Sequence, residues 1–97
     1  MNSVQTEFLY FASKRYIWWK SPESALKYPQ RILAQIMNLG SWDDVRKMYE
    51  LFSKDELRKV LLEAEAGQFS EKSWCYWNYI LANCPINSVP NPPERVL

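Results

Sequence analysis

Apolar residues recur along this chain at helical spacing, and polar segments with serine, proline or glycine separate the apolar runs. The pattern predicts helices over residues 22–28, 29–39, 42–52, 54–66 and 71–83, and a less regular run over 8–16 is interpreted as one more helix. No segment alternates apolar and polar residues with the period of two that is typical of a strand. We therefore predict an all-α fold, a single compact bundle of five to six short helices.

The residues between the apolar runs predict where the helices begin and end. Ser21 before Pro22 places a hydroxyl cap ahead of a proline at the first helical position. Pro29 ends that helix and begins the next, and Gly40 is expected to end the 29–39 helix in a left-handed conformation. Further capping serines are expected at the pairs Ser41–Asp44 and Ser53–Glu56 and at Ser70.

The stripes of apolar residues that these helices present are the expected core. Their members are Ile32, Leu33, Ile36, Met37, Val45, Met48, Tyr49, Phe52, Leu57, Val60, Leu61, Ala64, Trp74, Trp77 and Leu81, with Tyr76 and Ile80 beside them.

The C-terminal segment differs in kind from the helical region. Residues 85–97 contain four prolines within nine residues, which forbids helix and favours an extended polyproline conformation. We therefore divide the chain into a helical domain over 1–84 and an extended tail over 85–97. The tail is interpreted either as a frayed end or as a strap on an aromatic groove of this chain or of another protein.

Length and composition are typical of one small aromatic-rich domain. The chain has 97 residues, 47% of them hydrophobic and 15% aromatic, with five tryptophans. The net charge is +1; residues 1–40 carry five Lys/Arg against two Glu, and the remainder carry seven against nine Asp/Glu. This mild asymmetry lacks the clustered basic residues of a nucleic-acid footprint. Plain surface solvation explains it best.

Cysteine usage and hydropathy bear on location. Cys75 and Cys84 lie nine residues apart on or near one predicted helix, about 13.5 Å along the axis of a straight helix, which is too far for a disulfide. No apolar run approaches the length of about 18 residues that a membrane span needs. We expect a cytoplasmic protein with reduced cysteines and no membrane association.

The sequence offers little material for catalysis. It contains no histidine, which removes the commonest general base and metal ligand, and its two cysteines do not form a zinc spacing. Both glycines are explained as helix terminators, so no phosphate-binding loop is present. The acidic pairs Asp43–Asp44 and Asp55–Glu56 fall in first helical turns, where they favour the helix dipole. We predict that the chain is not an enzyme and holds no cofactor or metal.

A DNA-binding, helix-turn-helix-like repressor is the alternative from another class, because three short capped helices can form that motif. The 71–83 helix would then read bases, yet Lys72 is its only basic residue, and Ser73 and Asn78 are its few polar side chains. The basic residues of the two preceding helices are interleaved with acidic ones, as on a solvated face.

The segment from Arg15 to Lys20 is the hardest to place in a small bundle. Four bulky residues in succession, Tyr16 to Trp19, cannot all share one buried face, so at least one of Tyr16, Trp18 and Trp19 is expected to be partly exposed. Arg15 and Lys20 are positioned to stack on the indoles. The stretch is either core reached from two sides or a binding patch built from residue types enriched at interfaces.

Several separated motifs carry a resemblance to a known family. They are "WWKSPE", "AQIMNLG", "WDDV" and the aromatic cluster after "FS", within a span from Arg15 to Leu81. The chain resembles small bacterial proteins whose genes lie just upstream of a nucleotidyltransferase-type toxin of the abortive-infection class. Members of that family often carry histidines near the positions of Cys75 and Asn78, whereas this chain contains no histidine.

The resemblance implies an antitoxin that binds and neutralises the cognate toxin, and such a protein can also bind operator DNA. Aromatic anchors for the toxin are expected in the 15–20 segment, a charge contact at Arg31, and an extended contact along the tail. The expected partner-binding residues are Arg15, Tyr16, Trp18, Trp19, Lys20, Arg31 and Arg95.

Overall fold

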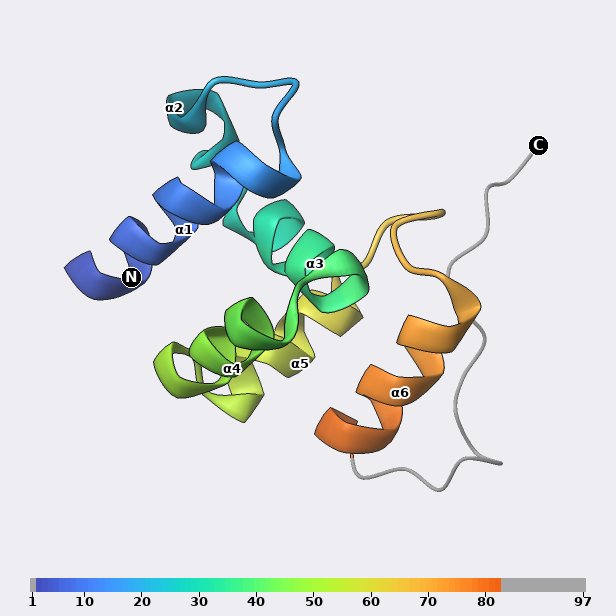
Figure 1. The fold of residues 1–97 in the computed structure, drawn as a ribbon. Coiled ribbons are helices and arrows are strands. Elements are labelled where there is room, and N and C mark those ends of the chain that lie inside the picture. The colour runs from blue at the N-terminus through green and yellow to red at the C-terminus, as the bar shows by residue number, and fades with distance from the viewer. Residues whose placement is uncertain (1, 83–97) are drawn as a thin grey trace.

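The computed structural model describes residues 2–82, and in that range the chain forms helices joined by short turns, with no strand (Figure 1). The helices are α1 (Ser3–Tyr16), α2 (Pro22–Ala25), α3 (Pro29–Leu39), α4 (Trp42–Leu51), α5 (Lys54–Leu62) and α6 (Glu71–Ala82). The predicted all-α class is therefore confirmed. No helix within the described range has the length and apolar character needed to cross a bilayer. The predicted tail and Cys84 lie outside the described residues.

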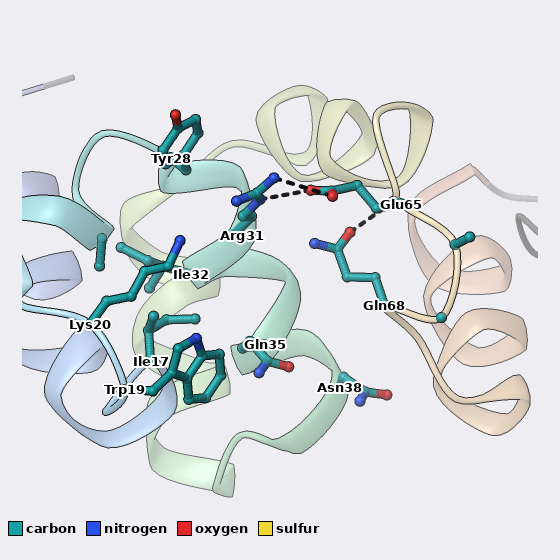
Figure 2. A pocket seen from close by; sticks show the side chains of 13 residues that line it. Ile17, Trp19, Lys20, Tyr28, Arg31, Ile32, Gln35, Asn38, Glu65 and Gln68 are labelled. Carbon is teal, nitrogen blue, oxygen red and sulfur yellow. Dashed lines mark hydrogen bonds and ion pairs between the residues drawn. The ribbon is translucent and has the colours of Figure 1, made fainter. Parts of the chain in front are cut away.

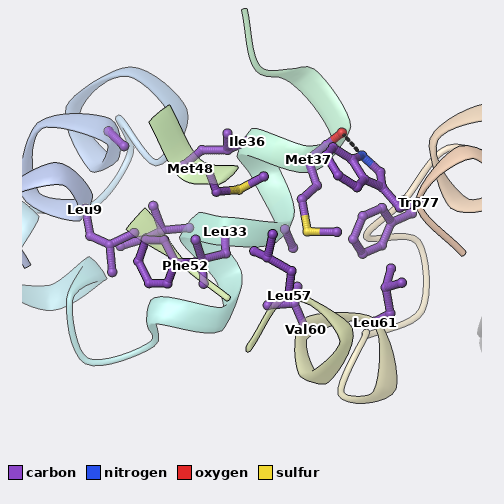
Figure 3. Close-up of a cluster of buried hydrophobic side chains, with 14 of the residues drawn as sticks. Leu9, Leu33, Ile36, Met37, Met48, Phe52, Leu57, Val60, Leu61 and Trp77 are labelled. Atoms are coloured by element: carbon purple, nitrogen blue, oxygen red, sulfur yellow. Dashed lines mark hydrogen bonds between the residues drawn. The ribbon is translucent and has the colours of Figure 1, made fainter. Parts of the chain in front are cut away.

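Helix α3 lies at the centre of the bundle, with α1 and α2 on one side of it and α4, α5 and α6 around its other faces (Figure 1). Because neighbours surround it, α3 buries Ile32, Ala34 and Ile36 completely. Figure 3 shows the core continuing from Leu9 in α1 to Trp77 in α6. The core thus contains at least one apolar residue of every helix.

Serine caps begin four of the helices, as the sequence predicts. The hydroxyl oxygens of Ser21, Ser41, Ser53 and Ser70 each accept a hydrogen bond from the backbone N–H three residues later. At Ser53 the capping box is complete, because the Glu56 side chain also accepts from the Ser53 backbone N–H. At Ser41 it is not complete, since the expected partner, Asp44, directs its carboxylate elsewhere.

Helix α1 begins five residues earlier than the apolar pattern indicates. Asn2 and Gln5 form a reciprocal capping box, in which each side chain accepts a hydrogen bond from the other residue's backbone N–H. The buried Gln5 amide also donates to the Leu51 carbonyl at 2.6 Å. This bond ties the start of α1 to the end of α4.

Helices α2 and α5 end earlier than predicted. Helix α2 ends at Ala25, and the chain continues to residue 28 in turns. Helix α5 ends at Leu62 rather than at residue 66. The Gln30 side-chain amide donates to the carbonyls of Val60 and Glu63, at 3.4 and 3.3 Å, and so satisfies the end of α5 from a distant part of the chain.

Gly40 ends α3 for a reason other than the predicted one. Its φ is −63° and its ψ 148°, an extended conformation open to any residue, so the left-handed prediction is wrong there. A Cβ at this position would instead collide with the carbonyl oxygen of Ile36, which accepts the Gly40 N–H at 2.7 Å. Among the described glycines only Gly67 has a positive φ, of 76°.

Candidate functional site

The turn after α1 exposes two adjacent tryptophans. The helix stops at Ile17, whose side chain is buried, and the Lys20 N–H donates to the Ile17 carbonyl at 3.1 Å to close a turn. Trp18 and Trp19 occupy the middle of this turn and are 76% and 55% exposed. Their rings meet edge to face, with centroids 5.7 Å apart. The prediction of partial exposure is confirmed, and the alternative that buries the whole stretch is wrong for both indoles.

A hydrogen-bond network fixes the base of this turn to the start of α4. The Tyr16 hydroxyl donates to Asp44 Oδ2 at 2.6 Å and accepts from the Ser41 backbone N–H at 3.2 Å. The Arg15 guanidinium donates to both Asp44 oxygens, at 3.1 and 2.9 Å. Asp44 therefore joins α1 to α4. It also holds Tyr16, which precedes Trp18 by two residues.

The protonation states in this network suit neutral pH. Burial raises the pKa of Tyr16, and its hydrogen bond to Asp44 raises it further. Burial alone would raise the pKa of Asp44, but the hydrogen bonds from Tyr16 and Arg15 outweigh it, and the pKa lies below its ordinary value. A neutral phenol thus donates to an ionised carboxylate.

Two further apolar residues, at the turn between α3 and α4, are exposed, and the sequence analysis missed both. Leu39 ends α3 and Trp42 begins α4, with exposed fractions of 65% and 74%. The contact of Ser41 with Tyr16 brings this corner against the end of α1. The sequence does carry a signal for the exposure of Trp42: its indole lies in a first helical turn, between a capping serine and two acidic residues. We use the name tryptophan surface for Trp18, Trp19, Leu39 and Trp42.

A pocket of about 350 Å³ adjoins the tryptophan surface (Figure 2). Four separate parts of the chain form it: the turn after α1, the segment from Ala25 to Tyr28, one side of α3, and the loop that follows α5. Trp19 stands at one edge of the pocket, and Glu65 and Gln68 stand opposite it. The buried side chains of Ile17 and Ile32 also line it.

Charged groups at the pocket differ in how they are paired. Arg31 forms two hydrogen bonds with Glu65, Nε to Oε1 at 2.8 Å and the terminal nitrogen to Oε2 at 3.3 Å, and this ion pair raises the pKa of Arg31. The Arg31 guanidinium also lies over the Tyr28 ring, 4.7 Å from its centroid. Lys20 Nζ lies 5.7 Å from the same centroid, and within residues 2–82 no ion pair includes it.

The predicted partner-binding residues fall into distinct environments. Arg15 bonds to Asp44 and Lys20 lies over Tyr28, so the prediction that these two cations stack on the indoles is wrong. Trp19, Lys20 and Arg31 share the pocket. Arg95 lies outside the described residues. That these residues contact a partner stays a prediction.

Helix α6 buries the side that carries its two tryptophans and keeps a tyrosine-rich side in solvent. Trp77 donates its indole N–H to the Met37 carbonyl at 2.6 Å (Figure 3). Asn78 is buried, and its amide donates to the Trp74 carbonyl at 2.9 Å. The alternative DNA-reading helix therefore has one of its few polar side chains turned inward.

Comparisons of this chain with protein-family models, with curated proteins and with solved structures find no match. Within residues 2–82, no group of three or more Cys, Asp or Glu side chains is placed to hold a metal ion. Function is therefore inferred from the sequence and from the geometry of the exposed residues.

Proposed function

We propose that this chain is a non-catalytic protein-binding module and that the tryptophan surface holds its partner. The observation that carries the proposal is the exposure of two adjacent indoles, Trp18 and Trp19, on one tight turn. Tryptophan is among the residues that dominate binding energy at protein interfaces. Contiguous exposed apolar groups on a small protein commonly mark an interaction site.

The way the indoles are held also supports binding. The turn is closed by a backbone hydrogen bond, Ile17 anchors it in the core, and the Tyr16–Asp44 bond fixes its base. Anchors that are already ordered lose less conformational entropy when a partner covers them. A partner would therefore meet indoles on a turn that hydrogen bonds and a buried side chain already hold in place.

The partner we propose is a nucleotidyltransferase-type toxin, which this chain would neutralise in the cytoplasm as an antitoxin. The motifs "WWKSPE", "AQIMNLG" and "WDDV" support this identity through the family resemblance. The first and third of these motifs contribute Trp18, Trp19 and Trp42, and the second contributes Leu39. Three of the four motifs that carry the resemblance thus contribute residues to the tryptophan surface.

The non-catalytic part of the proposal is supported by the ionisable groups. The sequence has no histidine, and three of the four carboxylates in the acidic pairs of α4 and α5 have structural partners. Asp44 bonds to Arg15 and Tyr16, Asp55 to Arg58, and Glu56 completes a capping box. These carboxylates stabilise the fold where they stand.

The test is co-expression with the product of the neighbouring toxin gene. The wild-type chain should form a stable complex with that protein and relieve its toxicity. The double variant Trp18→Ala, Trp19→Ala should fold with a near-normal melting temperature but lose the complex. Leu62→Ala is the control, because it removes an even more exposed apolar side chain from the end of α5.

Two outcomes would contradict the proposal. One is a wild-type chain that neither binds nor neutralises the toxin. The other is a double variant that neutralises it as well as Leu62→Ala does. Binding to promoter DNA with a steep salt dependence, in the absence of toxin binding, would favour the repressor alternative instead.

A further inference from the structure

The pocket beside Trp19 holds a net positive charge. Arg31 and Glu65 neutralise each other through two hydrogen bonds. Lys20 reaches the same space with its ammonium near the Tyr28 ring, and it forms no ion pair within the described part of the chain (Figure 2). A single carboxylate entering the pocket would therefore meet one uncompensated cation.

The rest of the pocket suits the stem of an acidic side chain. The indole of Trp19 stands at its edge, and the buried residues Ile17, Ala25 and Ile32 line it. Apolar groups of this kind take up methylene groups, while an ammonium above an aromatic ring remains available to an anion. The pocket thus combines an apolar patch with one uncompensated charge, that of Lys20, beside the Arg31–Glu65 pair and the amides of its polar lining.

We propose that this pocket receives an acidic side chain of the protein partner, whose carboxylate pairs with Lys20 while its methylene stem packs against Trp19. This inference rests on the proposed function, because Trp19 belongs both to the tryptophan surface and to the pocket. A protein seated on the tryptophan surface would border the opening of the pocket. Charge complementarity then sets the orientation of the partner.

The first experiment uses a defined probe and needs no toxin. The ¹⁵N-labelled chain is titrated with acetyl-Leu-Glu-Leu-amide and, separately, with acetyl-Leu-Gln-Leu-amide at millimolar concentration. The glutamate peptide should shift the Trp19 indole and Lys20 signals, and the glutamine peptide should bind about fivefold more weakly. In Lys20→Gln the two peptides should bind equally.

Lys14→Gln is the matched control, because Lys14 is also an exposed lysine over aromatic rings, those of Tyr10 and Phe11, and does not line the pocket. It should keep the preference for the glutamate peptide. The inference is overturned if the peptides bind alike to the wild type, if Lys20→Gln keeps the preference, or if no pocket signal shifts.

The second experiment separates this inference from the proposed function. Lys20→Gln should weaken toxin binding about fivefold at low salt and less at high salt, whereas Lys14→Gln should leave it unchanged. If the toxin binds the wild type and Lys20→Gln equally, the pocket proposal fails and the proposed function stands. If the toxin binds neither, the proposed function fails, and the peptide titration alone decides what the pocket binds.

Discussion

Two groups of tryptophans in this molecule have opposite surroundings. Trp77 on α6 is 2% exposed, donates its indole N–H to the Met37 carbonyl, and meets the rings of Tyr49 and Tyr76. Trp18 and Trp19 lie on a turn, largely in solvent, and their two rings contact each other. One group closes the core and the other leaves apolar surface open.

The difference follows from the element that carries each residue. On a helix, a tryptophan spaced three or four positions from other apolar residues shares their buried face. On a turn, where Ile17 already occupies the inward position, neighbouring side chains are directed outward. Aromatic content alone therefore does not distinguish core from binding surface, whereas periodicity together with helix termination does.

The largest effect on stability is expected from the buried indole. Trp77→Ala should lower the free energy of unfolding by about 3–5 kcal/mol, because it opens a cavity and leaves the Met37 carbonyl without its donor. Urea denaturation measures this loss. Trp77→Phe keeps much of the volume and should lose clearly less. A stability loss below about 1 kcal/mol in Trp77→Ala would break the comparison, since Trp77 would then not be a core residue.

A smaller effect is expected from the network under the exposed turn. Asp44→Asn should lower the free energy of unfolding by about 1 kcal/mol, because Tyr16 and Arg15 lose a charged acceptor. Urea denaturation at neutral pH measures it, with Asp43→Asn as control for the charge of the helix turn. Equal losses in the two variants would contradict the special role of Asp44.

The same network predicts a pH dependence. The pKa of Asp44 is lower in the folded chain than its ordinary value of 3.8, so its stabilising contribution is fully present above that value. It is lost as the pH falls through the lowered folded-state pKa. Between about pH 5 and pH 2, the wild type should therefore lose more stability than Asp44→Asn does. Parallel acid denaturation curves for the two proteins would contradict this.

An exposed ion pair should matter less still. Arg31→Ala removes the pair with Glu65, which lies at the surface, and should change the free energy of unfolding by no more than about 0.5 kcal/mol. Denaturation of Arg31→Ala beside Glu65→Ala measures it. A loss of unfolding free energy above about 2 kcal/mol would contradict this, because the Arg31–Glu65 pair would then behave as a buried ion pair rather than a surface one.

Local signals in the sequence predicted most of the fold. The serine caps, the prolines at first helical positions and the apolar stripes act over one or two turns, and the structure confirms them at α3, α4 and α6 within about one residue. The end of α5 was not predictable in this way, because Gln30, far away in the chain, supplies the donor for its last carbonyls. The start of α1 was readable in principle from the pair Asn2 and Gln5.

The candidate site was only partly predictable. Crowding of bulky residues predicted that at least one of Tyr16, Trp18 and Trp19 is partly exposed, since one helix face cannot hold four of them in succession. The exposure of Trp42 escaped prediction because its spacing to Val45 fits the buried stripe of its own helix. The pocket depends on the turn after α1, on α3 and on the loop near Glu65, and their meeting is a property of the tertiary fold.

The most direct test of the tryptophan surface is one variant measured in two ways. Trp18→Ala changes the most exposed indole of the pair, so its free energy of unfolding should stay within about 0.5 kcal/mol of the wild type. By titration calorimetry, its dissociation constant for the toxin should rise about 30-fold or more, equivalent to about 2 kcal/mol. A folded variant with unchanged affinity, or one destabilised as strongly as Trp77→Ala, would contradict the account.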